Sequence, residues 1–225
     1  MIGILFPAYN EEKNIQIVIQ EAKKYFPNSK IVVVDDGSED KTGEIARKNK
    51  VIVLTHKKNK GKGEALKTGF KYFLKNNNVD IIIVADSDRQ YSIRDAISLI
   101  KPIQKGKADY VVGCRNWKQI PFRHRIGNFI WRTVFNVLFR TKLKDTNCGF
   151  IAMKMDVVKK LKIHGGYIID NAMLIQAIKN EFRIVNIPVS IHYKHKRNFF
   201  NGSRIVIGIT FFILKQGIKY NLNKL

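Results

Sequence analysis

The chain has 225 residues, of which 41 are Lys or Arg and 18 are Asp or Glu, so its net charge is +23 at pH 7. Its hydrophobic content of 45% argues for a folded protein, and its length fits one domain or one domain with an appendage. No window reaches the roughly 18 uninterrupted apolar residues that span a bilayer. The charge predicts an anionic partner, which could be a nucleotide-linked substrate, an acidic membrane surface or nucleic acid.

The cysteines and the first residues bear on the compartment. Cys114 and Cys148 match no metal-binding spacing and no disulfide framework. Met1 leads directly into an apolar stretch without a basic leader, so we expect no secretory signal. Together these features predict a reducing, cytoplasmic location.

Short apolar runs alternate with amphipathic segments along the chain. We predict strands at 2–6, 30–34, 51–54, 81–85, 110–113, 151–153 and 183–191. We predict helices at 10–22, 42–48, 64–75, 95–104 and 170–179, the first of them capped by Asn10. This alternation is typical of βαβ units and predicts an α/β fold with a mostly parallel central sheet flanked by helices.

The run at 81–85 ends in Asp86 and Asp88, two carboxylates spaced one residue apart. If the strand continues through them, both side chains lie on one face, because side chains alternate along a strand. Carboxylates that close repel each other unless a cation lies between them or one takes a proton. Oxygen ligands suit Mg²⁺ or Mn²⁺ shared with a substrate phosphate, so we predict a metal–diphosphate site. The alternative is a strand that runs into a polar turn.

Two further predicted strands end in polar segments, at 7–11 and 35–38, and a basic, glycine-containing loop lies at 57–63. In open α/β sheets, ligands bind outside the carboxyl ends of the strands. Convergence of three such strand ends on one edge therefore favours a ligand site over a set of unrelated turns.

These motifs also resemble a known family. Pro7-Ala-Tyr-Asn-Glu11, Asp35-Asp-Gly-Ser38, Asn59-Lys-Gly-Lys-Gly63 and Asp86-Ser-Asp88 with Gln90-Tyr91 occur in the order and spacing of family 2 glycosyltransferases of the GT-A fold. Among these enzymes the chain is most similar to dolichyl-phosphate mannose synthases and related polyprenyl-phosphate sugar transferases. The resemblance implies a Rossmann-like GT-A domain over 1–204, with a nucleotide-sugar half at about 1–115 and an acceptor half at about 116–204. Residues 205–225 would form an amphipathic basic tail.

The resemblance implies roles for individual residues on the donor side. Donor contacts are expected from Pro7, Ala8, Tyr9, Glu11, Asp36, Lys62, Asp86 and Arg204. The expected ligands of Mg²⁺ or Mn²⁺ are Asp88 first, then Asp86 and Gln90. Asp35 is expected to brace the loop rather than to touch the nucleoside.

The expected acceptor side departs from the pattern of many relatives at the position of the catalytic base. Many inverting relatives carry a glutamate base for a sugar hydroxyl, whereas this chain has Ala172 in that region, with Asp170 as a partial substitute. A phosphate monoester acceptor is already anionic, so it needs no base but does need cations to position it. The expected phosphate contacts are Arg115, Arg123, Arg197 and Arg204. For each arginine the alternative is ordinary surface charge.

We therefore expect a metal-dependent, inverting transfer of a hexose, with GDP-mannose as a candidate donor, to a polyprenyl or dolichyl phosphate. Segments 123–139 and 205–214 pair apolar and basic side chains, which favours interfacial helices on the cytoplasmic face of a membrane. They could instead cap the sheet or pair in a homodimer. Another alternative is a UDP-sugar donor with a saccharide hydroxyl acceptor and Asp170 as base. A nucleic-acid-binding protein is more remote, because the clustered carboxylates would repel phosphate in the absence of a metal.

Overall fold

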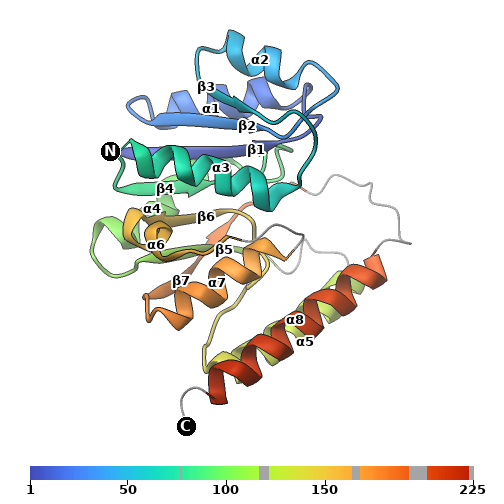
Figure 1. Cartoon of the computed structure of the whole chain (residues 1–225). Coiled ribbons are helices and arrows are strands. Elements are labelled where there is room, and N and C mark those ends of the chain that lie inside the picture. The colour runs from blue at the N-terminus through green and yellow to red at the C-terminus, as the bar shows by residue number, and fades with distance from the viewer. Residues whose placement is uncertain (77, 117–121, 164–167, 193–201, 223–225) are drawn as a thin grey trace.

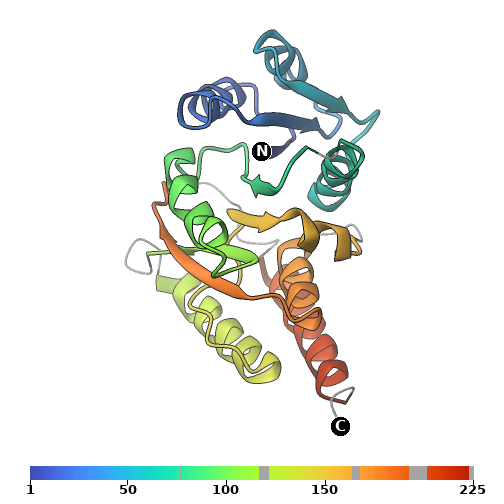
Figure 2. The ribbon, with the colours of Figure 1, turned by 90° about the vertical axis from the view of Figure 1, so that its left-hand side faces the viewer.

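A computed structural model describes residues 1–76, 78–116, 122–163, 168–192 and 202–222, apart from the side chains of 122–127 and 202–207. Figure 1 shows a central sheet with helices on both faces and a pair of long helices beside its lower end. In Figure 2 the first part of the chain lies above and the second part below. The α/β architecture with a mostly parallel sheet is therefore confirmed.

Seven strands form one sheet in the order β3-β2-β1-β4-β6-β5-β7. They are β1 (Ile2–Ala8), β2 (Lys30–Asp35), β3 (Ile52–Thr55), β4 (Ile81–Val84), β5 (Tyr110–Arg115), β6 (Ile151–Lys154) and β7 (Ile184–Val189). The helices are α1 (Ile15–Tyr25), α2 (Thr42–Lys48), α3 (Lys62–Lys75), α4 (Ala96–Gln104), α5 (Phe122–Phe139), α6 (Met155–Lys160), α7 (Ile169–Lys179) and α8 (Gly202–Leu222), with a 3₁₀ turn η1 (Ile93–Asp95). The short helix α6 has no counterpart among the sequence-based predictions.

The central strands are buried on both faces, and this explains their continuous apolar sequences. Every residue of β4 is buried, as are Ile4, Leu5 and Phe6 of β1. β1 continues through Pro7 to Ala8, two residues past its predicted end. Its pairing with β4 stops at Leu5, so Pro7 lies beyond the last β4 partner while its pairing with β2 continues.

The predicted cap at Asn10 is wrong. The first helix begins at Ile15, and Asn10 has a left-handed backbone with φ of 55°. Long-range hydrogen bonds hold this segment as a loop: Asn10 N donates to Ser38 Oγ at 3.0 Å, and Asn10 Oδ1 accepts from Glu39 N at 2.9 Å. Contacts between two strand ends thus override the local signal for a helix start.

Strand β6 runs antiparallel to both of its neighbours, β4 and β5. An antiparallel strand begins where its neighbours end, so the loop that leads into Ile151 lies at the carboxyl edge of β4 and β5. Gly113 N donates to Phe150 O at 2.9 Å at this point. The second half of the chain therefore supplies a loop to the edge on which the first-half motifs converge.

Helices α5 and α8 lie side by side and run in the same direction. Trp131 Nε1 donates to Thr210 Oγ1 at 2.7 Å, and Asn221 Nδ2 donates to Leu138 O at 2.8 Å. Gly217 lets the helices approach closely, since a Cβ there would lie 2.7 Å from Leu138 Cβ. Within the described ranges, neither of them nor any other helix has the length and apolar character needed to cross a bilayer.

Candidate functional site

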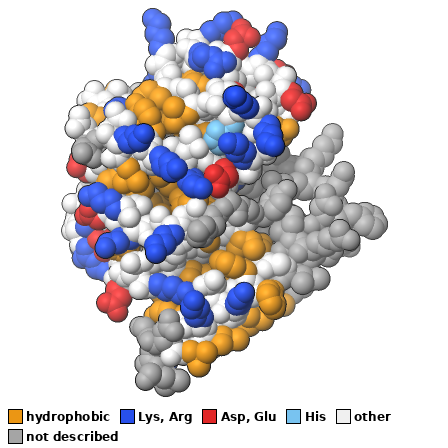
Figure 3. Space-filling model, in the orientation of Figure 1, with side chains coloured by type: hydrophobic (Ala, Val, Ile, Leu, Met, Phe, Trp, Pro, Cys, Tyr) orange, Lys and Arg blue, Asp and Glu red, His pale blue; other side chains and the backbone are white. Residues whose placement is uncertain are grey.

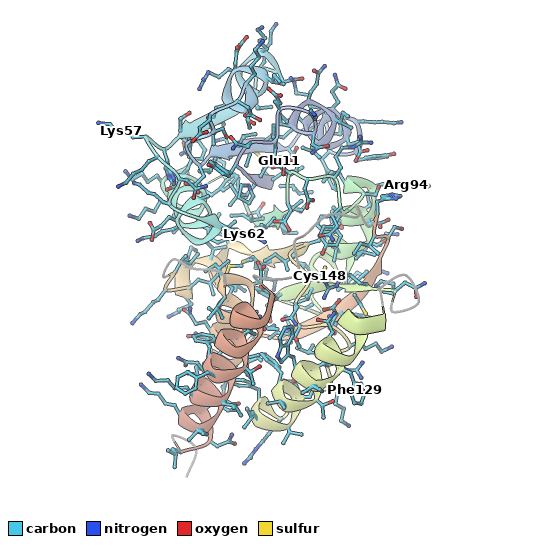
Figure 4. The ribbon with its side chains drawn as sticks, turned by 90° about the vertical axis from the view of Figure 1, so that its right-hand side faces the viewer. Glu11, Lys57, Lys62, Arg94, Phe129 and Cys148 are labelled. Atoms are coloured by element: carbon cyan, nitrogen blue, oxygen red, sulfur yellow. The ribbon has the colours of Figure 1, made fainter. Side chains whose placement is uncertain are left out.

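The loops that follow β1, β2 and β4 meet at one edge of the sheet, which Figure 4 views face-on. Glu11 N donates to Thr42 Oγ1 at 2.7 Å, joining the first loop to the start of α2. Ser87 Oγ donates to Pro7 O at 2.9 Å, joining the end of β1 to the turn after β4. The predicted convergence of three strand ends is therefore confirmed by direct hydrogen bonds.

The segment 7–11 has a buried side and an exposed side. Ala8 is buried, and the carbonyl of Pro7 is used by Ser87. Glu11 Oε2 accepts from Asn14 Nδ2 at 2.6 Å, whereas the Tyr9 side chain is exposed at the edge. The donor contacts that the sequence assigns to this segment remain predictions, and Tyr9 is the member placed on the surface.

Asp36 is buried and anchors the basic loop. Its Oδ2 accepts from Gly61 N at 2.7 Å, and its Oδ1 accepts from Lys60 N at 3.0 Å. Asp35 accepts from Ser38 N at 3.0 Å, so the bracing role predicted for it is shared by Asp36. A contact between Asp36 and a nucleoside stays a prediction.

Asp86 and Asp88 lie in a turn beyond the end of β4, which stops at Val84. The expectation that strand alternation aligns them is therefore wrong, because the strand ends before either carboxylate. Asp88 Oδ1 accepts from Gln90 N at 2.9 Å, and Asp86 Oδ1 pairs with Lys62 Nζ at 2.9 Å. Both carboxylates are partly exposed at the edge of the sheet.

Lys62 joins the two halves of the molecule. Its ammonium lies 2.9 Å from Asp86 Oδ1 and 3.1 Å from Asp170 Oδ2 at the start of α7. Burial acts to lower the pKa of Lys62, but the charges of Asp170 and Asp86 act in the opposite direction and prevail, so that pKa is raised above its usual value. Gly149 makes room for this arrangement, because a Cβ there would lie 2.8 Å from Lys62 Nζ. The sequence predicted Lys62 as a donor contact but not its link to Asp170, which lies 108 positions away.

The turn after β4 fits a hard divalent cation. Among the described residues, no three His, Cys, Asp or Glu side chains cluster as a complete ligand set. Mg²⁺ typically takes one or two carboxylates and completes its shell with water and substrate phosphates. Asp86 and Asp88 offer such oxygen ligands, and Gln90 follows them closely in sequence, so a metal site at these three residues stays a prediction.

Arg115, the last residue of β5, is largely buried against Asp145, which lies in the loop that leads into β6. Its Nε donates to Asp145 Oδ2 at 2.7 Å and its Nη2 donates to Asp145 Oδ1 at 3.0 Å. Burial acts to lower the pKa of Arg115, and the facing Asp145 carboxylate outweighs it, so that pKa lies above its usual value. A phosphate contact from Arg115 stays a prediction, and it would have to share a guanidinium that Asp145 already binds. The side chains of Arg123, Arg197 and Arg204 lie outside the described residues.

Cys148 belongs to the apolar backing of this site. Figure 4 shows it with Lys62 between the upper and lower parts of the molecule. Burial raises the pKa of the Cys148 thiol to about 12, so it stays neutral at physiological pH. Tyr91 stacks on Phe150 with ring centroids 5.4 Å apart. These contacts pack the loop before β6 against the turn that carries Asp86.

Known proteins share this fold over nearly the whole chain. The crystal structure of glucosyl-3-phosphoglycerate synthase from Mycobacterium tuberculosis with Mn²⁺, UDP-glucose and phosphoglyceric acid superposes with a TM-score of 0.78. It covers 96% of this chain and 79% of that one at 19% identity, which confirms the GT-A fold.

Sequence comparison identifies closer relatives. An uncharacterized protein of Methanocaldococcus jannaschii is 34% identical over 98% of both chains. The UDP-N-acetylglucosamine–dolichyl-phosphate N-acetylglucosaminyltransferase of Methanococcus voltae is 29% identical over 96% of this chain and 97% of its own. Residues 4–162, which include every strand end and carboxylate described above on the donor side, match the family model for glycosyl transferase family 2. The chain therefore belongs to glycosyl transferase family 2.

Proposed function

We propose that the protein transfers a hexose from a nucleotide sugar to the phosphate of a polyprenyl or dolichyl phosphate, with inversion at the anomeric carbon and with Mg²⁺ or Mn²⁺. The observation that carries this proposal is the pairing of Asp170 with Lys62. A carboxylate that is bound to an ammonium is a poorer base than an unpaired one, and Ala172 offers no base at all. An acceptor that already carries an anionic oxygen needs neither.

The reaction has one bond made and one bond broken. An acceptor phosphate oxygen attacks the anomeric carbon in line, and the bond from that carbon to the diphosphate oxygen breaks. The cation, when bound, neutralises the departing diphosphate. Asp86, Asp88 and Gln90 would hold the ion, and Lys60 in the basic loop and Lys62 at the start of α3 would add positive charge beside the diphosphate. Proposed acceptor contacts are Arg115, Arg123, Arg197 and Arg204.

The relatives support the acceptor class and leave the donor to experiment. The Methanococcus voltae relative is described as acting on UDP-N-acetylglucosamine and dolichyl phosphate. The motifs of this chain also resemble those of mannose synthases, for which GDP-mannose would be the donor. We therefore propose a nucleotide hexose as the donor class and a lipid phosphate as the acceptor class.

The outer surface of α5 and α8 supports a membrane-bound acceptor. Figure 3 shows apolar side chains gathered over this helical pair next to Lys and Arg. The exposed apolar side chains are Phe129, Ile130, Val137, Phe211, Leu214, Ile218 and Leu222. Lys215 and Lys219 lie among them on α8. Such a surface suits the cytoplasmic leaflet, where apolar side chains enter the interface and lysines meet anionic headgroups.

The membrane proposal is tested by flotation with anionic vesicles. Phe211→Glu, at a side chain that is 68% exposed, is expected to abolish binding without a change in thermal stability. Ile97→Glu, at a 36% exposed side chain of α4, is the matched control and should bind like the wild type. Vesicle binding unaffected by Phe211→Glu, or a stable homodimer that buries this surface, would contradict the proposal.

The transfer itself is tested with GDP-mannose, UDP-glucose and UDP-N-acetylglucosamine, each with Mg²⁺ or Mn²⁺ and a short polyprenyl phosphate. We expect one donor to give a sugar phosphoryl lipid, followed by mass. Asp88→Asn should lower the rate by at least about a hundredfold, whereas Asp80→Asn, at an 81% exposed side chain, should not. If the protein transferred sugar to saccharide hydroxyls and not to lipid phosphates, the proposed acceptor class would be wrong. If it bound nucleic acid at physiological salt and did not bind nucleotide sugars, the whole proposal would be wrong.

A further inference from the structure

One largely buried histidine connects three elements around the donor edge. His56 follows β3 directly, and its side chain is 9% exposed. Its Nδ1 lies 2.6 Å from Asp36 Oδ1 at the end of β2, and its Nε2 lies 2.8 Å from Thr68 Oγ1 on α3. Its backbone N–H donates to Asp35 O at 2.9 Å. The ring therefore ties the end of β2 to the helix that begins at Lys62.

The carboxylate that receives His56 also holds the basic loop. Asp36 accepts from the backbone N–H groups of Lys60 and Gly61, the two residues immediately before Lys62. Gly61 has φ of +87°, a conformation that a residue with a side chain rarely adopts. At Gly37 a Cβ would lie 2.5 Å from the backbone carbon of Lys58, so the loop packs directly on the turn after β2. Asp36 is thus the anchor of the loop, and His56 fixes the anchor.

The hydrogen-bond roles of the ring follow from its partners. Asp36 offers only acceptor atoms when ionised, so Nδ1 carries a proton. The Thr68 hydroxyl can donate to an unprotonated Nε2 or accept from a protonated one. The ring can therefore keep its hydrogen bonds to Asp36 and Thr68 whether the imidazole is neutral or protonated.

The loop needs such a brace because of its charge. Its cationic side chains are Lys57, Lys58 and Lys60, and Lys62, whose ammonium is paired with Asp86 and Asp170, follows at the start of α3. Lysines this close repel one another, and the repulsion favours a spread, solvated loop. A ligand that requires the loop in one conformation would otherwise meet the cost of ordering it.

We propose that His56 is a positioning residue for the donor diphosphate: through Asp36 it holds the loop at 57–61 in the conformation that presents Lys60 and Lys62 to that group. The brace itself rests on the observed contacts, and only its ligand, a nucleoside diphosphate, rests on the proposed function. The two can therefore be tested separately.

Limited trypsin digestion measures how well the loop is ordered in the absence of substrate, because trypsin cleaves after lysine. His56→Leu is expected to speed native-state cleavage within 57–62 by about tenfold, the effect of losing one hydrogen bond to a charged group. His56→Asn keeps an N–H donor near Asp36 and should restore much of the protection, and Thr68→Val should have an intermediate effect. Thr55→Ala, at the exposed neighbouring residue, is the control and should match the wild type.

Donor kinetics then test the ligand. His56→Leu should raise KM for the nucleotide sugar about tenfold with kcat nearly unchanged, because a disordered loop weakens donor binding and leaves the chemical step intact. His56→Asn should bring KM back close to the wild-type value. Cleavage of His56→Leu within twofold of the wild type would overturn the brace; if that variant does not fold, His56→Asn and Thr68→Val decide by the same criterion. Faster cleavage without any effect of UDP or GDP on the wild-type loop would leave the brace in place and refute its diphosphate ligand.

Discussion

The pair formed by Arg115 and Asp145 gives the sharpest test of the acceptor half. In Asp145→Asn the side-chain shape is kept, while the buried guanidinium loses its counter-charge. The two side chains are 11% and 4% exposed. Arg115 donates to Asp145 from Nε, Nη2 and the backbone N. Breaking one partner of a buried, bidentate pair costs about 3–5 kcal/mol, because the remaining charge stays desolvated.

Urea denaturation measures this loss. With a slope of about 2–3 kcal/mol/M, the midpoint of Asp145→Asn should fall by about 1–2.5 M. Asp80→Asn removes an exposed pair with the chain's amino group and should leave the midpoint nearly unchanged. A loss below about 1 kcal/mol for Asp145→Asn would refute the reasoning, since it would mean that water or another group compensates the guanidinium. In that case Arg115 would be available to an acceptor phosphate at little cost.

Three further predictions concern pH, packing and metal. Hydrogen bonding from Arg183 holds the pKa of Asp109 below its usual range. The ionised Asp109 therefore contributes its full stabilisation of the fold above about pH 4 and loses it as the pH falls further. In acid denaturation, the difference in unfolding free energy between the wild type and Asp109→Asn should shrink over the same range. A Cβ at Gly149 would lie 2.7 Å from Asp86 Oδ2, so Gly149→Ala should raise the Mg²⁺ concentration for half-maximal transfer about tenfold with an unchanged unfolding midpoint; an unchanged metal requirement would contradict the site. Chelation should abolish transfer and added Mn²⁺ or Mg²⁺ restore it, and full activity in chelator would exclude the metal role.

Local sequence signals predicted most of the strands and helices of the donor half. Apolar runs such as 81–84 form strands buried on both faces, and their shortness and β-branched residues favour strands over buried helices. The polar segments after them converge because parallel strands end at one edge. Local signals failed where distant contacts decide: Asn10 carries a helix-start pattern, yet its hydrogen bonds to Ser38 and Glu39 hold it in a loop.

Contacts between residues far apart in sequence were harder to predict, in both halves of the chain. Lys62 and Asp170 meet only because α7 packs near the start of α3, and no periodicity encodes that approach. His56 carried no recognisable motif, and its role depends on partners in two other elements. Charge counts identified many arginines without indicating that Arg115 is bound by an internal carboxylate.

The strand order has a consequence for synthesis on the ribosome. Among the described residues, strand β5 pairs with β6 and β7 alone, and both of these are made after it. Until residues 151–154 emerge, β4 also keeps one open edge toward the place of β6. Open, apolar strand edges recruit other chains, so a nascent or truncated chain that ends near residue 115 is expected to aggregate even though β1, β2, β3 and β4 are complete. The nucleotide half therefore depends on the acceptor half for the strand that covers its open edge.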